Sequence, residues 1–137
     1  MKLLLLRGLP ASGKTTFAKE LVRKDGNLVR VNKDDLRNML HGGKWSSGRE
    51  KRVVSLERQL VTEALEDGRN VIVDDTNLNP THERYFKRLA ESHNADFEIK
   101  EFDTPLEECI KRDNVRPNGV GETVIRKMYN QYLKPAP

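Results

Sequence analysis

Eight consecutive residues near the amino terminus have the spacing of a phosphate-binding loop: Gly8-Leu9-Pro10-Ala11-Ser12-Gly13-Lys14-Thr15. Its glycines let the backbone wrap around an anion, so that successive N–H groups point at phosphate oxygens. Lys14 adds a full positive charge, and the Thr15 hydroxyl suits the Mg²⁺ that accompanies ATP. The segment therefore predicts a nucleoside-triphosphate site formed by Gly8, Pro10, Ala11, Ser12, Gly13, Lys14, Thr15 and Thr16.

A carboxylate and a guanidinium, Asp34 and Arg37, follow the short apolar run 28–31. Ligands of parallel sheets bind beyond the carboxyl ends of the strands, so Asp34 could accept a proton from an attacking hydroxyl. Arg37 is three residues further on, on the same helical face, where it could hold an anionic substrate. The pattern equally allows Asp34 to be a helix N-cap and Arg37 a solvated helix residue.

Asp75 and Thr76 directly follow a second buried run, 70–73. A carboxylate beside the phosphate loop can hold Mg²⁺ through water, or it can hold the acceptor. An Asx turn leaving the strand is the alternative, and the adjacent Asp74 leaves the register open.

Two arginines four residues apart, Arg112 and Arg116, lead into a segment that contains Pro117 and Gly119. Arginines on a hinged lid, here about residues 112–121, can close over ATP and neutralise the transferring phosphoryl group. Cations at a helix carboxyl end are also favoured by the helix dipole alone.

Trp45 lies in residues 41–48, the most flexible-looking stretch of the chain, near the cations Lys44, Arg49, Lys51 and Arg52. A tryptophan in such company can stack a nucleic-acid base. The alternative is a half-buried packing residue.

The elements that position these residues alternate between strand and helix. We expect strands at 2–6, 28–31, 70–73 and 95–102, and helices at 15–24, 33–40, 49–66, 80–92, 105–114 and 122–133. The helix at 49–66 is expected to be amphipathic, with Val53, Leu56, Leu60 and Ala64 on one face. Such alternation predicts an α/β, P-loop NTPase-like sandwich, with a central parallel sheet of about four strands and helices on both faces.

The bulk composition predicts one domain over residues 1–137. The net charge of +4 is compatible with a polyanionic partner and requires none. The single cysteine, Cys109, favours a reducing, cytoplasmic setting because it cannot form an internal disulfide. The apolar run 3–6 is too short for a membrane span, so we expect no membrane association.

Four segments together resemble the kinase domain of the bacteriophage polynucleotide kinases, which transfer the γ-phosphate of ATP to 5′-hydroxyl ends of DNA or RNA. They are the phosphate loop, Val-Asn-Lys-Asp-Asp-Leu-Arg, Val-Asp-Asp-Thr-Asn-Leu-Asn-Pro and Lys-Arg-Asp-Asn-Val-Arg. The likeness runs from Met1 to about Leu133 with the spacing between segments preserved. It implies ATP and Mg²⁺ as cofactors, nucleic acid as partner, and the cytoplasm of a bacterium or of a phage-infected host as location.

The resemblance also implies a role for each matching residue. Asp34 is then the general base, and Arg37 contacts the substrate phosphate beside the 5′ end. Asp75 and Thr76, rather than Asp74, are the matching acceptor-side residues, while Arg112 and Arg116 bind phosphate. Lys14, Asp34 and Arg116 are the expected catalytic set, and Thr15 and Asp75 the expected metal partners, Asp75 through water.

One departure from the phage enzymes is the lack of the Asp-x-Asp-Gly-Thr motif of their phosphatase half. We therefore expect a stand-alone kinase or an isolated kinase domain, with no phosphatase domain. Two alternatives remain: a P-loop kinase of a small-molecule alcohol such as a nucleoside, sugar acid or antibiotic, and a non-catalytic ATP-binding switch. The preference for DNA or RNA and the oligomeric state stay open.

Overall fold

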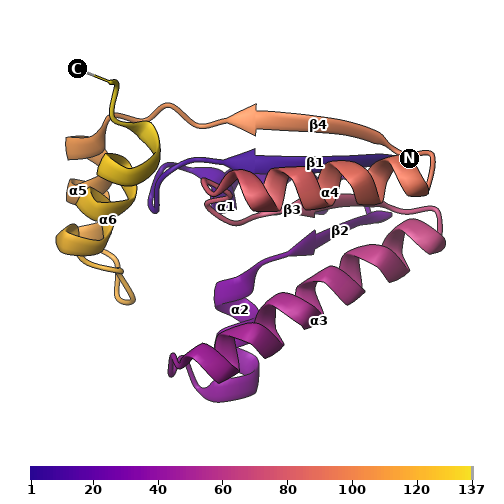
Figure 1. The fold of residues 1–137 in the computed structure, drawn as a ribbon, viewed down its shortest axis with the longest axis horizontal. Coiled ribbons are helices and arrows are strands. Elements are labelled where there is room, and N and C mark those ends of the chain that lie inside the picture. Colours follow the sequence, from indigo (N-terminus) through magenta and orange to yellow (C-terminus); the bar gives the residue numbers. More distant parts are fainter. Residues whose placement is uncertain (137) are drawn as a thin grey trace.

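A computed structural model describes residues 1–136. Four parallel strands form one sheet in the order β2-β3-β1-β4, which confirms the predicted fold class (Figure 1). At the centre, Leu4 of β1 lies opposite Ile72 of β3 and Glu98 of β4. The strands are β1 (Lys2–Arg7), β2 (Leu28–Val31), β3 (Asn70–Val73) and β4 (Asp96–Glu101).

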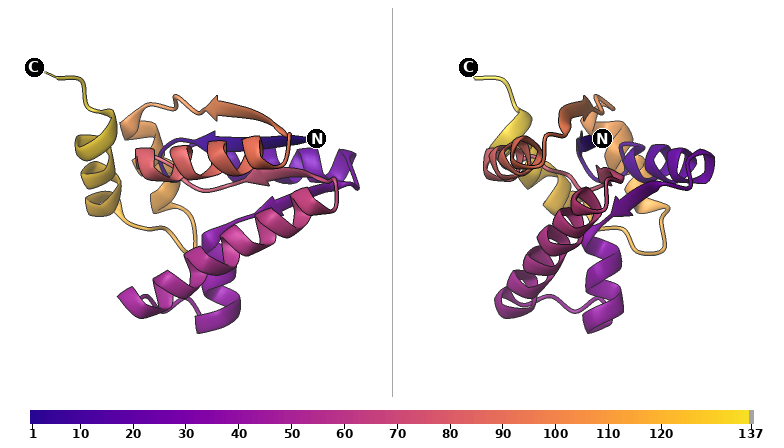
Figure 2. Two further views of the ribbon diagram at one scale, coloured as in Figure 1. Left: turned by 45° about the vertical axis from the view of Figure 1, so that its right-hand side comes forward. Right: turned by 90° about the vertical axis from the view of Figure 1, so that its right-hand side faces the viewer.

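Helices cover both faces of the sheet, as predicted. Figure 2 shows α3 and α4 on one side of the strands and α1 on the other. The connection from β1 leaves on the α1 side and that from β3 on the α4 side. A crevice opens between adjacent strands whose connections leave on opposite sides. The helices are α1 (Lys14–Lys24), α2 (Lys33–His41), α3 (Ser47–Glu66), α4 (Pro80–Ser92), α5 (Leu106–Asn114) and α6 (Glu122–Met128).

The leucines of β1 divide between two cores because side chains of a strand alternate between the faces of its sheet. Leu3 and Leu5 pack with α3 and α4 in the larger core. Leu6 packs with Ala18 of α1 in the smaller one. Burial on both faces explains why this strand is an uninterrupted apolar run.

A third apolar cluster lies beyond the carboxyl ends of the strands, where α5 and α6 pack against each other (Figure 1). Leu9 of the phosphate loop and Leu78 join Cys109, Ile110 and Ile125 in it. This cluster fixes the two carboxyl-terminal helices beside the phosphate loop.

The sequence placed the apolar face and the start of α3 only approximately. The fully buried residues of this helix are Val53, Glu57, Val61, Ala64 and Leu65, whereas Leu56 and Leu60 are partly buried. The helix also begins at Ser47 rather than at residue 49, because the Ser46 side chain accepts a hydrogen bond from Arg49 N and caps it.

The last predicted helix, 122–133, is not α-helical throughout. It changes at Tyr129 into the π-helical turn η1 (Tyr129–Leu133), where Lys134 N donates to Tyr129 O.

Among residues 1–136, no helix is both long and apolar enough to cross a membrane.

Candidate active site

The phosphate loop joins β1 to α1 through a backbone that few residues can adopt. Gly13 has a φ of 105°, and Ala11 has a φ of 62°. A Cβ on Gly8 would stand 2.9 Å from the Cβ and the carbonyl oxygen of Phe102, so only glycine fits there without a shift. Thr104 Oγ1 donates to Ser12 O at 2.9 Å and ties the loop to the segment after β4.

Lys14 is buried within this loop. Its ammonium donates to Gly8 O at 2.9 Å, to Leu9 O at 2.6 Å and to Ser12 Oγ at 3.2 Å. Burial lowers the Lys14 pKa from 10.5 to about 8, and the Asp74 carboxylate opposes part of this shift. A phosphate would replace neutral oxygens by charged ones around this cation and stabilise its protonated form.

Asp34 lies in the first turn of α2 without capping it. Asn32 is the cap, since its Oδ1 accepts from Asp35 N at 2.8 Å. The alternative in which Asp34 is the N-cap is therefore wrong. The Asp34 side chain is 72% exposed at the cleft and pairs with Arg37. Its carboxylate is left accessible to a substrate.

Arg37 is a partly buried residue held by α3, and so is not the solvated side chain that the pattern also allowed. Two of its nitrogens donate to the Glu50 carboxylate at 3.0 and 2.8 Å. This two-point contact fixes the plane of the guanidinium. The Glu50 pKa is lowered, first by its hydrogen bonds from Arg37.

Asp75 joins three elements at the carboxyl end of β3. Its Oδ1 accepts from Lys33 N at 2.8 Å, which anchors the start of α2. Its side chain also neighbours the carboxyl group of Glu57 on α3, which is only 3% exposed. Burial, and after it the neighbouring Asp75 carboxyl, raises the Glu57 pKa to about 10. Burial therefore favours the neutral form of Glu57 beside Asp75.

Asp74 points to the α1 side of the same strand end. It is fully buried, and its Oδ2 accepts from Arg30 Nε at 2.8 Å, while its Oδ1 has no hydrogen-bond partner. It lines the cleft as Asp75 does. The two aspartates therefore differ in surroundings rather than in access to the cleft.

The two arginines of the predicted lid come from α5 and the loop after it. Arg112 Nε pairs with Glu108 at 3.1 Å, and Arg116 pairs with Asp113 at 2.5 Å. Asp113 is buried and also accepts from Val120 N at 3.0 Å and Gly121 N at 2.8 Å. One carboxylate thus folds the lid segment back onto α5.

These residues line one cleft of about 940 Å³ beyond the carboxyl ends of the strands. Two of the predicted nucleotide-binding residues, Gly8 and Ser12, lie outside its lining because they form the inner wall of the loop. The structure brings together Pro10, Ala11, Gly13, Lys14, Thr15, Thr16, Asp34, Arg37, Asp75, Thr76, Arg112 and Arg116.

The cleft offers oxygen ligands suited to a Mg²⁺ ion carried by ATP. Within residues 1–136, no cluster of three or more acidic, histidine or cysteine side chains could hold a metal alone. Mg²⁺ commonly binds through one or two protein oxygens and the substrate phosphates. The Thr15 hydroxyl and the free Asp74 Oδ1 or the Asp75 carboxylate fit that pattern.

A sequence profile of the protein family described as an AAA domain matches residues 3–135. The chain belongs to this family of P-loop kinases. It is similar in fold to the APS kinase CysC of Mycobacterium tuberculosis, with a TM-score of 0.68 and 22% identity. That match covers 99% of this chain and 84% of the other.

Two proteins are 28% identical to this P-loop kinase. One is a "Putative bifunctional polynucleotide kinase/RNA ligase" of Autographa californica nuclear polyhedrosis virus, aligned over 149 residues, 97% of this chain and 21% of that protein. The other is an L-seryl-tRNA(Sec) kinase of Methanococcus maripaludis, aligned over 137 residues, 97% of this chain and 53% of that protein. The chain thus spans about a fifth and about half of these relatives, and neither comes from a bacteriophage.

A solved structure is more similar. A chain in the Pnkp1/Rnl/Hen1 RNA repair complex is 35% identical, with a TM-score of 0.76. The match covers 95% of this chain and 43% of that one.

Sequence reasoning missed three carboxylates that hold the site together: Glu50, Glu57 and Asp113. For Glu57 a signal existed, because it stands four residues from both Val53 and Val61 on the buried stripe. Glu50 and Asp113 carry no such signal. Arg37 becomes a neighbour of Glu50, and Val120 N and Gly121 N become neighbours of Asp113, only in the folded chain.

Proposed function

We propose that this chain is an ATP-dependent polynucleotide kinase that phosphorylates 5′-hydroxyl ends of DNA or RNA. The observation that carries the proposal is the Asp34 carboxylate, which is not used as a cap and faces the cleft that the phosphate loop also lines. A kinase needs a proton acceptor opposite its bound nucleotide, whereas a binding switch needs none. The polynucleotide kinase relative and the RNA repair complex support nucleic acid as the acceptor, and repair of broken ends as its use.

In the proposed mechanism, Asp34 accepts the proton of the 5′-hydroxyl as its oxygen attacks the γ-phosphorus of ATP, and ADP leaves. Arg37, with its plane fixed by Glu50, binds the substrate phosphate next to the 5′ end. Lys14 and the loop N–H groups hold the nucleotide phosphates. Thr15, with Asp75 acting through water, would hold a Mg²⁺ ion that would neutralise phosphate charge. Arg112 and Arg116 belong to the lid, residues 112–121, which closes over the nucleotide. All of these residues belong to one kinase domain of residues 1–137.

The test is transfer from γ-labelled ATP to short DNA and RNA oligonucleotides with 5′-hydroxyl ends, beside the same oligonucleotides with 5′-phosphates. Asp34→Asn is expected to lower transfer by about 10²- to 10⁴-fold, because it removes the proton acceptor and keeps the size of the side chain.

Asp35→Asn is the matched control. Asp35 is the adjacent exposed aspartate, and it pairs with Arg30 outside the cleft lining. Nearly full transfer by Asp34→Asn, or equal losses in both variants, would contradict the general-base role.

Phosphorylation of a different alcohol is the second candidate, and the similarity to the seryl-tRNA kinase favours it. A seryl-tRNA and a pool of small alcohols belong in the same assay as the oligonucleotides. Transfer to either of these, with none to 5′-hydroxyl ends, would replace the first proposal. ATP binding without transfer to any acceptor would indicate a switch.

A further inference from the structure

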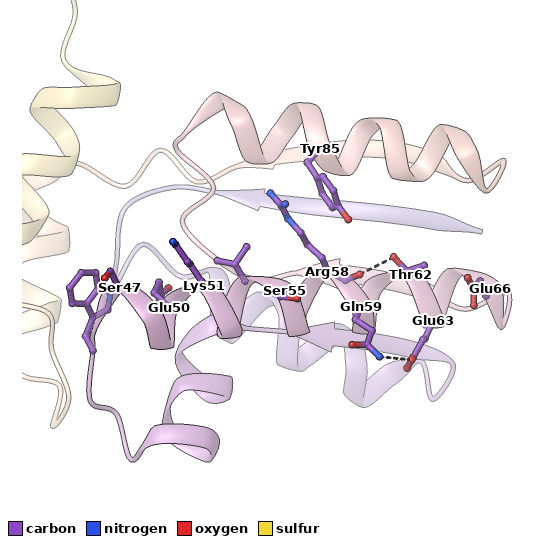
Figure 3. Close-up of a pocket in the computed structure, with 12 residues that line it drawn as sticks. Ser47, Glu50, Lys51, Ser55, Arg58, Gln59, Thr62, Glu63, Glu66 and Tyr85 are labelled. Carbon is purple, nitrogen blue, oxygen red and sulfur yellow. Dashed lines mark hydrogen bonds between the residues drawn. The ribbon is translucent and has the colours of Figure 1, made fainter.

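A second cavity, of about 900 Å³, runs along the outer side of α3 and reaches α4 (Figure 3). Its lining comes from a stripe of α3 distinct from the buried stripe, with Lys51, Ser55, Arg58 and Thr62 spaced three or four residues apart. Tyr85 of α4 closes the opposite side. We call this cavity the α3–α4 groove.

The groove continues into the candidate active site. Trp45 and Glu50 line both cavities. Glu50 is occupied by Arg37, whereas the Trp45 indole is 68% exposed. The half-buried packing role considered for Trp45 is therefore wrong. A large apolar ring stands at the junction of the two cavities with most of its surface open to a ligand.

Charge is unevenly distributed along the groove. The half near the active site carries the cations Lys51 and Arg58, and the far half ends at Glu63 and Glu66 (Figure 3). A polyanion is therefore attracted to the near half and repelled from the far one.

Arg58 is placed so that it can also contact a base. One face of its guanidinium lies over the Tyr85 ring, with the guanidinium carbon 3.8 Å from the ring centre. The Tyr85 ring holds the guanidinium plane in place, and such a plane stacks on nucleobases as well as on aromatic side chains.

We propose that the near half of the α3–α4 groove binds the single-stranded nucleotides that follow the reacting 5′ end. A base stacks on Trp45, Lys51 contacts a backbone phosphate, and a further base packs on the Arg58 guanidinium. Aromatic stacking combined with cations along the backbone is the usual way to bind single strands without reading their sequence. This inference rests on the proposed function, and it predicts a preference for acceptors several nucleotides long.

The first experiment measures KM for 5′-hydroxyl acceptors from a nucleoside 3′-monophosphate to a hexanucleotide. In the unmodified protein KM is expected to fall with length. Trp45→Ala should raise KM for the hexanucleotide by about 5- to 140-fold and leave KM for the monophosphate and for ATP unchanged. An unchanged hexanucleotide KM, or the same increase for the monophosphate, would overturn the proposal.

A matched pair of charge changes on α3 tests whether the nucleic acid lies along the α3–α4 groove. Lys51 lines the groove, whereas its neighbour Arg52 is exposed and lines neither cavity. Lys51→Gln should weaken hexanucleotide binding and lower the slope of log affinity against log salt by about 0.7, because one phosphate contact is lost. Arg52→Gln should do neither. Equal effects in the two variants would indicate only general attraction to a basic helix and would overturn the proposed binding along the groove.

A readout without phosphate transfer separates this proposal from the proposed function. Trp45 is the single tryptophan of the chain and lines both cavities, so its emission reports on their junction, and the Lys51→Gln and Arg52→Gln variants show whether the groove is occupied. A 5′-phosphorylated hexanucleotide added without ATP should quench that emission, more weakly in Lys51→Gln than in Arg52→Gln. If quenching occurs while no 5′-hydroxyl end is phosphorylated, the proposed kinase function is wrong and the groove proposal stands. Emission that the oligonucleotide leaves unchanged would overturn the groove proposal and favour a protein occupant.

Discussion

The phosphate loop, residues 8–15, and the lid, residues 112–121, face the same cleft but are held in different ways. The loop is fixed by its own backbone, and its lysine is buried against its own carbonyl oxygens. The lid arginines have side chains that are 49% and 43% exposed, and each is paired with a nearby carboxylate. The loop is therefore formed in advance, whereas in the proposed mechanism Arg112 and Arg116 exchange those carboxylates for phosphate oxygens.

The largest expected effect tests the lid half of this contrast. Arg116→Ala should lower the single-turnover rate with saturating ATP by about a thousandfold, because a positive charge that stabilises the transferring phosphoryl group is lost. The matched control is Arg126→Ala, which removes an arginine of α6 paired with Glu107 and Glu122 outside the cleft lining. A loss below tenfold in Arg116→Ala would mean that the lid does not touch the reacting phosphate.

The next effect tests whether the loop is preformed. Gly8→Ala places a methyl group against Phe102 and should lower the free energy of unfolding by about 1–3 kcal/mol, with weaker ATP binding. Gly26→Ala is the control, since a Cβ there would meet no atom within 4 Å. Denaturant unfolding and ATP titration measure both effects. Equal stability of the two variants would show that the loop can relax.

The same contrast explains which features could be predicted from the sequence. Strands 28–31 and 70–73 and the helix 80–92 match the observed bounds, because apolar runs and an N-terminal proline are local signals. The phosphate loop could be predicted for the same reason, because its motif is also a local signal. The lid anchor was not, because Asp113 accepts from N–H groups seven and eight residues away and no pattern marks such a contact. No role was predicted for Glu57 from the sequence, since its neighbour Asp75 belongs to another element.

A pH titration of ATP affinity tests the charge of the buried Lys14 side chain. Lys14 has a pKa lowered to about 8, so its charge is lost as pH rises through that value. ATP affinity is therefore expected to be steady below pH 8 and to fall by about tenfold per unit above it. Lys14→Met should bind weakly with a flat profile, and a slope that persists in this variant would assign the titration to another group.

The smallest effect concerns how the lid is held. Asp113→Asn weakens the acceptor of Val120 N and Gly121 N, so these two amides should exchange hydrogen about tenfold faster. Turnover should fall only several-fold, because Arg116 itself remains. Hydrogen exchange and steady-state rates measure the two quantities. Unchanged exchange at both amides would place the lid anchor elsewhere.

The start of α2 is fastened to β3 at two adjacent residues. Asn32 Nδ2 donates to Asp74 O at 2.5 Å, and Lys33 N donates to Asp75 Oδ1 at 2.8 Å. Tilting this helix would break both bonds and move Asp34 relative to the phosphate loop. Divergence toward another alcohol is therefore expected to proceed through the surrounding walls, such as residues 41–48 and α3, while the orientation of α2 is retained.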